Sequence, residues 1–115
     1  MNSLGKEGEE FAVRFLKKEG YRIIDKNYRT PFGEIDIIAD DGGVLVFIEV
    51  KTRSGDIFGF PFEAVDRKKR DTIRKVALCY LKKIRKEPAA RFDVLSIDFE
   101  GGKKKIAHIK DAFEV

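Results

Sequence analysis

Glu49 and Lys51 interrupt the apolar pattern of the segment VLVFIEVKTR at residues 44–53. The apolar run at its start is typical of a strand that is covered on both faces, yet Glu49 and Lys51 follow it directly. Because alternate residues of a strand project from the same face, these two side chains are expected to lie together. A carboxylate in such a place is costly unless an ammonium group or a bound cation compensates for its charge. Glu49 and Lys51 are therefore candidate functional residues.

Asp36 is a second acid within an apolar strand, because it lies among the isoleucines of EIDII at residues 34–38. The DDGG segment that follows predicts a tight hairpin, which places this strand antiparallel to the next one. Asp36 can then lie across from Glu49 or Lys51. Two carboxylates repel each other, and Mg²⁺ (or Mn²⁺) removes that repulsion while keeping waters for a substrate phosphate. We therefore predict a metal site with Asp36 and Glu49 as its ligands.

A lysine beside that cation can orient the attacking water and stabilise the charge that builds up at phosphorus. Asp36, Glu49 and Lys51 thus supply the parts of metal-assisted phosphodiester hydrolysis. The alternative interpretation is a buried ion pair between two strands. Such pairs stabilise a core less than apolar packing does, so the functional interpretation is favoured. The acid-x-Lys pattern alone is weak, since residues 66–68 match it without the apolar strand.

Residues 4–19 predict a helix, because their apolar side chains recur at helical spacing. Glu9 shares a helix face with Ala12 and Leu16, so its side chain can point inward toward the same site. Glu10 lies on the charged face and is expected at the surface.

A second helix is predicted at residues 62–86, and it carries a basic stripe from residue 67 onward. Such a stripe suits phosphate contact, although a solvated helix face is an equally good interpretation. Lys69 lies on the apolar side of this helix, where its stem could cover the core or its head could contact phosphate. The candidate nucleic-acid contacts are Arg53, Lys69, Arg70 and Arg74.

The remaining pattern predicts one α/β domain over residues 1–115, with the order αβββαβ and a short final strand. The strands are expected at residues 21–29, 34–39, 44–53, 92–99 and 105–109. They form one sheet with a helix on each face.

The composition indicates which partners and which cellular compartment are expected for the protein. Its 24 basic and 20 acidic residues give a net charge of +4, too modest to prove a nucleic-acid partner by itself. The single cysteine, Cys79, excludes an internal disulfide and favours a reducing compartment. No apolar run has the length of a signal peptide or a membrane span. A cytoplasmic protein without a membrane partner is expected.

Four segments together resemble the YraN-like family of small bacterial predicted endonucleases. They are GEID at 33–36, FIEVKTR at 47–53, RFDVLSI at 91–97 and HIKDAF at 108–113. That family is similar to a branch of the PD-(D/E)XK nuclease superfamily, closest to archaeal-type Holliday junction resolvases. The resemblance implies a three-layer, restriction-endonuclease-like fold with a mixed sheet.

The resemblance also implies a catalytic set of Glu9, Asp36, Glu49 and Lys51, with Ile35 where the superfamily signature has proline. The expected function is a metal-dependent endonuclease that acts on DNA, with branched or structured DNA as a candidate substrate. A branch-resolving enzyme must cut two strands in related positions, so a twofold homodimer is expected. The alternative is a non-catalytic nucleic-acid-binding module, or a structural partner, that retains the nuclease fold.

Overall fold

The computed structural model describes residues 4–54 and 66–113 of the chain. Two helices and five strands follow one another along it. They are α1 (Leu4–Lys18), β1 (Arg22–Thr30), β2 (Gly33–Asp41), β3 (Val44–Ser54), α2 (Arg67–Ile84), β4 (Ala90–Glu100) and β5 (Lys103–Phe113). No helix in these described segments is long and apolar enough to cross a membrane.

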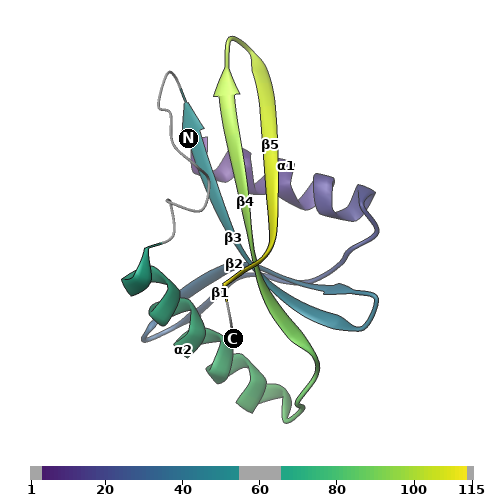
Figure 1. Cartoon of the computed structure of the whole chain (residues 1–115), viewed down its shortest axis with the longest axis vertical. Coiled ribbons are helices and arrows are strands. Elements are labelled where there is room, and N and C mark those ends of the chain that lie inside the picture. The colour runs from purple at the N-terminus through teal and green to yellow at the C-terminus, as the bar shows by residue number, and fades with distance from the viewer. Residues whose placement is uncertain (1–3, 55–65, 114–115) are drawn as a thin grey trace.

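The five strands form one mixed sheet in the order β1-β2-β3-β4-β5 (Figure 1). β3 and β4 are parallel, and the other neighbours are antiparallel. Parallel strands need a crossover connection, and α2 lies in the connection between β3 and β4. The predicted α/β class, with one sheet and two helices, is confirmed.

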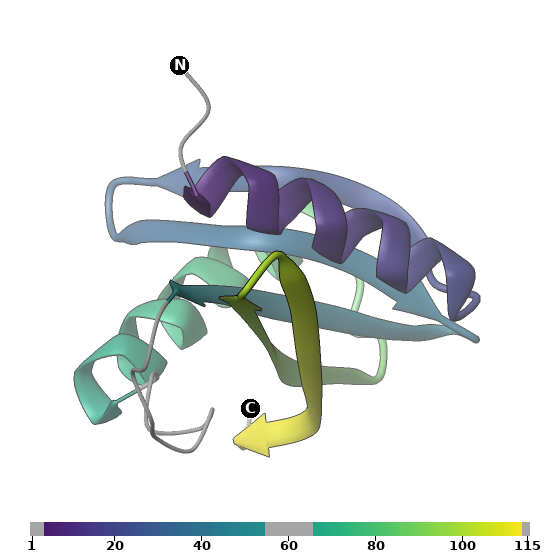
Figure 2. The same ribbon diagram turned by 90° about the horizontal axis from the view of Figure 1, so that it is seen from above.

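Two apolar cores lie against the sheet, one under each helix. Ala12 and Leu16 of α1 pack in one core with Val46, while Ile73 and Val76 of α2 pack in the other. Figures 1 and 2 show the two helices on opposite sides of the sheet. β3 therefore has apolar residues on both faces, which explains why its first half is continuously apolar.

The helix ends follow ordinary capping chemistry. Gly20, with a φ of 94°, follows α1 in the left-handed conformation that glycine adopts most easily. Asp66 caps α2, since its side chain accepts a hydrogen bond of 2.8 Å from the backbone N–H of Lys69. α2 ends at Ile84, two residues before the predicted end, because Arg85 turns into the left-handed conformation. The predicted start, at residues 62–65, lies outside the described residues.

The last strand is longer than predicted. Residues 105–109 were expected, whereas β5 runs over Lys103–Phe113 and pairs with β4 along nearly its whole length. β5 lies at the edge of the sheet, where charged residues are common because one side of the strand has no neighbour. Its lysines hid the strand pattern in the sequence.

Candidate active site

β2 and β3 stop pairing at the point where the predicted acids begin. Their paired residues run from Asp41 opposite Val44 to Ile37 opposite Ile48. Two residues beyond Ile48, the backbone N–H of Val50 donates a hydrogen bond of 2.8 Å to Oδ2 of Asp36. A side-chain carboxylate therefore takes the place of a backbone acceptor, and Asp36 is fixed against the strand that carries Glu49.

β2 also changes face at Asp36. Residues two apart in a regular strand share a face, yet Ile35 belongs to the core under α2 and Ile37 to the core under α1. The strand is therefore bent between them, and the Asp36 side chain lies where the two faces meet. This bend lets one carboxylate interact with Glu49 of β3 and with Glu9 of α1.

Asp36 and Glu49 form a buried carboxyl pair, with exposed fractions of only 8% and 7%. Burial, followed by the neighbouring charge of Asp36, raises the pKa of Glu49 to about 7 against the opposing effect of nearby lysines. Burial also raises the pKa of Asp36, although the hydrogen bond from Val50 opposes the shift. The pair therefore favours holding a proton between its two carboxyl groups near neutral pH.

Two lysines approach Glu49 from different elements. Nζ of Lys51, on the same strand, lies 4.0 Å from Oε1 of Glu49, and Nζ of Lys69, from the first turns of α2, lies 3.7 Å from it. The contact of Lys51 agrees with the two-residue spacing in the sequence. The contact of Lys69 was not predicted, although its place on the apolar side of α2 was the available signal.

Glu9 completes an acidic group around Asp36. Burial and the charges of Asp36 and Glu34 raise the pKa of Glu9, while a hydrogen bond with the Asn27 side chain opposes this. Glu9 is half-buried and Glu10 is exposed, as helical spacing predicts.

Gly8 lets α1 come this close to the sheet. A Cβ atom at Gly8 would clash with the Thr52 side chain of β3. Because Glu9 follows Gly8 in α1, this close approach brings Glu9 toward Asp36, with which it interacts.

A cavity of about 260 Å³ opens beside Asp36, between α1 and the first two strands. It is lined by Lys6, Glu9, Glu10, Val13, Lys26, Asn27, Asp36 and Ile37. Asn27 has a φ of 54°, an uncommon backbone conformation that asparagine tolerates better than most residues. Asn27 was missed in the sequence, because its approach to Glu9 depends on how β1 turns next to the helix.

The other predicted nucleic-acid contacts lie in different surroundings. Arg53 bonds to Asp98 at 3.0 Å and to Ser96 at 3.3 Å on the neighbouring strand. Arg74 bonds to Asp71 at 2.9 Å and lies over the ring of Phe113. Arg70 is half-buried, and its Nε has no hydrogen-bond partner. Lys69, by contrast, pairs with Glu49 of the acid pair at 3.7 Å.

The donor set fits a hard divalent cation that keeps most of its waters. Among residues 4–54 and 66–113, no three His, Cys, Asp or Glu side chains form a ready-made metal cage. Asp36 and Glu49 offer two carboxylates, and Mg²⁺ is bound in proteins by one or two carboxylates with water and phosphate oxygens. A cation would displace the shared proton, since ligands bind metal in their deprotonated form.

Comparison with known proteins places this site in a family. The model of the Uncharacterised protein family UPF0102 matches residues 8–97, which include all four residues of the predicted catalytic set. A UPF0102 protein of Thermodesulfovibrio yellowstonii is 51% identical, with 96% of this chain and 95% of the relative covered. A UPF0102 protein of Geobacter metallireducens is 47% identical, with 98% and 93% covered. The chain belongs to the UPF0102 family.

Proposed function

We propose that this UPF0102 protein is a metal-dependent endonuclease that hydrolyses phosphodiester bonds in DNA. The observation that carries the proposal is the buried carboxyl pair of Asp36 and Glu49, with two lysines at its edge. Two acids held together without full compensation are costly to a fold, and such groups are concentrated at functional sites.

Asp93 supports this interpretation by contrast. It is another buried acid, but it accepts hydrogen bonds from Arg91 at 3.0 Å and from the backbone of Asp111 at 3.0 Å, and it lies 2.7 Å from His108. These bonds outweigh burial and lower the pKa of Asp93. Full pairing is what a purely structural acid needs, and the Asp36–Glu49 pair has a raised pKa instead.

Each residue of the site has its own role in the proposed hydrolysis. Asp36 and Glu49 would hold Mg²⁺ or Mn²⁺, which supplies positive charge beside the phosphate that is attacked. Lys51 is positioned to orient the attacking water and to donate a hydrogen bond to the phosphoryl oxygen as its charge increases. Lys69 offers a second ammonium group for the same oxygens, and Glu9 helps to orient Asp36.

The fold supports this assignment in two ways. The order αβββαβ, with a mixed sheet between two helices, is the one implied by the resemblance to restriction-endonuclease-like nucleases. α1 approaches the acids through Glu9, which interacts with Asp36, and α2 approaches them through Lys69 in its first turn, 3.7 Å from Glu49. The positive end of a helix dipole favours phosphate.

A non-catalytic nucleic-acid-binding module is the second candidate. It is favoured by one observation, namely that Lys51 and Lys69 both lie within 4.0 Å of Glu49 and compensate for its charge without a cation. In that case Asp36, Glu49 and the lysines would form a structural ion cluster.

Cleavage assays separate these candidates. Purified protein is incubated with linear, single-stranded, flap and four-way DNA in Mg²⁺, in Mn²⁺ and in chelator. We expect metal-dependent products that Asp36→Asn abolishes and Glu10→Gln retains, since Glu10 is exposed on the same cavity edge. DNA binding without products on any substrate would favour the non-catalytic module.

A further inference from the structure

An exposed aromatic side chain lies at the tip of the hairpin that joins β1 and β2. Phe32 is 58% exposed, more than any other large apolar residue that the structure describes. Within residues 4–54 and 66–113, no second ring packs on it, whereas Phe92 of the core stacks on Phe113. A single exposed apolar residue is ordinary, so its meaning depends on the turn that carries it and on what surrounds that turn.

The turn that carries Phe32 is held by hydrogen bonds. The Thr30 hydroxyl accepts a hydrogen bond of 3.1 Å from the backbone N–H of Phe32 and donates one of 3.3 Å to the carbonyl oxygen of Gly33. Pro31 comes between them, and its ring restricts the backbone further. A side chain on such a turn loses little conformational freedom on binding, which suits a residue that recognises a ligand.

The tip of this hairpin lies next to the acid pair. At about 3.3 Å per residue, the Cα atoms of Phe32 and Asp36 are at most about 13 Å apart. The tip also packs against α2, since a Cβ atom at Gly33 would meet the Thr72 side chain. Thr72 is one helical turn from Lys69, the α2 lysine that pairs with the acids. Phe32 therefore lies close to the place at which the phosphate is proposed to be attacked.

The surface beside the tip suits phosphate. Lys68 and Lys75 are exposed on α2, four residues before and three residues after Thr72, and therefore on the same side of the helix. Glu34 and Asp71, the neighbouring acids in the chain, are each paired with an arginine, at 2.8 Å and 2.9 Å. Positive charge from the two lysines therefore predominates along this edge of α2.

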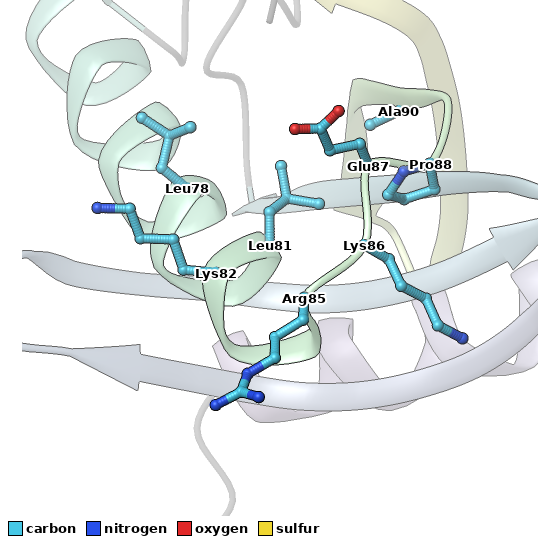
Figure 3. Close-up of a pocket in the computed structure, with 8 residues that line it drawn as sticks. All are labelled: Leu78, Leu81, Lys82, Arg85, Lys86, Glu87, Pro88 and Ala90. Atoms are coloured by element: carbon cyan, nitrogen blue, oxygen red, sulfur yellow. The ribbon is translucent and has the colours of Figure 1, made fainter.

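Leu78, another exposed apolar residue, lies in different surroundings. It lines a hollow of about 700 Å³ between the end of α2 and the segment that leads into β4 (Figure 3). Figure 3 shows the charged ends of the three basic lining residues pointing away from this hollow, while the Glu87 carboxylate stands among the aliphatic ones. None of the lining residues is aromatic. The hollow therefore offers a nucleic-acid base neither a ring nor a facing cation.

We propose that Phe32 stacks on an unpaired base of the DNA substrate, close to the phosphate that is cut. This inference rests on the proposed nuclease function and names the feature that the site recognises in its substrate, a base without a partner at a branch, a flap or a mismatch. Bases of any sequence stack on aromatic side chains, and phenylalanine is also used to separate stacked base steps. A fully paired duplex must first be unstacked at a cost, so this contact selects structured DNA.

Binding measured without cleavage tests the inference. A duplex with one unpaired base and a fully paired duplex of the same sequence are titrated with the intact protein in chelator, and affinity is followed by fluorescence anisotropy. We expect wild type to bind the duplex with the unpaired base more tightly. Phe32→Leu should weaken that binding by about tenfold, the size expected for loss of one base–ring stack, and should leave the affinity for the paired duplex unchanged.

Two further variants show whether the aromatic ring itself is needed. Phe32→Trp should keep the preference for the unpaired base, because it keeps an aromatic surface. Leu78→Ala is the matched control, since it removes an exposed apolar side chain at the far end of α2 and should bind both duplexes as wild type does. The melting temperatures of the Phe32 variants should stay close to that of wild type, because the side chain is exposed. A loss of affinity then does not come from unfolding.

Equal affinity of Phe32→Leu and wild type for the duplex with the unpaired base would overturn the inference. Equal binding of the two duplexes by wild type, or no binding of either, would overturn it as well. Failure of the nuclease proposal looks different, because the preference and its dependence on Phe32 would remain in chelator while Mg²⁺ and Mn²⁺ gave no products.

The position of the cut gives a second check where products form. The side chains add a few ångströms to the backbone separation of Phe32 and Asp36, so the stacked base and the cut phosphate lie within about 20 Å, or about six nucleotides at 3.4 Å each. Product ends within that distance of the unpaired base are expected. Cuts only at greater distances would contradict the stacking of that base on Phe32.

Discussion

At the scale of single residues, the carboxyl group of Glu49 is held where its neutral form is favoured. Burial and the charge of Asp36 raise its pKa to about 7, even though Lys51 and Lys69 oppose the shift. A folded protein that stabilises the protonated form of an acid loses stability when that acid must ionise. The fold therefore carries a cost at this site that a bound cation would relieve.

The first prediction concerns this cost. The pKa of Glu49 rises from its usual 4.5 to about 7 on folding. The contribution that favours the fold is thus present below pH 4.5 and is lost as pH rises through about 7. In chelator at pH 8, Glu49→Gln should be more stable than wild type by about 1–3 kcal/mol, since each pKa unit is worth about 1.4 kcal/mol.

Thermal melts at pH 8 and pH 5 measure this, and the difference should shrink at the lower pH. A variant less stable than wild type at pH 8 would mean that the ion pairs with Lys51 and Lys69 dominate, and the acid pair would then be structural.

The second prediction separates catalysis from binding at Lys51. Its proposed contact forms with charge that appears only in the transition state, so Lys51→Ala should lower the cleavage rate by about 100-fold or more. DNA affinity, measured by anisotropy, should change little. Loss of affinity and rate in equal proportion would place Lys51 among ordinary phosphate contacts.

At the scale of elements, the site depends on how closely α1 packs against β3. Gly8 is the residue at this contact, because a Cβ atom there would meet the side chain of Thr52. β2 contributes through its bend at Asp36, which frees the N–H of Val50 for the carboxylate. The missing side chain at Gly8 of α1 and the bend of β2 at Asp36 therefore both contribute to the geometry of the site.

The third prediction tests that packing. Gly8→Ala should displace α1 from β3, move Glu9 away from Asp36, and lower both the melting temperature and the cleavage rate. Gly5→Ala is the matched control, because Gly5 is exposed in the same helix. Alanine there should stabilise the protein by up to about 1 kcal/mol through helix propensity. Equal effects of the two changes would show that the close approach at Gly8 does not position the site.

The elements and the acid pair could be predicted from the sequence, whereas several contacts could not. Asp36 and Glu49 stand out because each interrupts an apolar strand, and the DDGG hairpin fixes those strands as neighbours. The contact of Lys69 with Glu49 depends on how α2 is rotated over the sheet. The contact of Asn27 with Glu9 follows an irregular pairing in β1. Neither contact produces a periodic pattern that could be recognised in the sequence.

At the scale of the whole molecule, the basic residues of α2 differ in their exposure to solvent. Arg70 and Arg74 are both half-buried, and Arg74 lies over the ring of Phe113 and bonds to Asp71. Lys68 and Lys75 are exposed instead. Charge reversal at the two arginines would disturb packing, and the two lysines give a cleaner test of DNA binding.

The fourth prediction uses these lysines. DNA affinity should fall steeply with salt, because each phosphate that the protein neutralises releases counterions. Lys68→Glu with Lys75→Glu should reduce the slope by about one to two units and leave the melting temperature nearly unchanged, since exposed charges contribute little to stability. An unchanged slope would mean that DNA approaches from another side of the molecule.

The most direct test of the account is calorimetric titration of the protein with Mn²⁺ or Mg²⁺, in buffers that differ in ionisation enthalpy. If Asp36 and Glu49 share a cation, wild type should bind it, with millimolar affinity sufficing because substrate phosphate completes the coordination. Binding near pH 7 should release protons from the carboxyl pair, and Asp36→Asn should abolish it. Equal binding by wild type and Asp36→Asn, or no binding by either, would contradict the shared metal site.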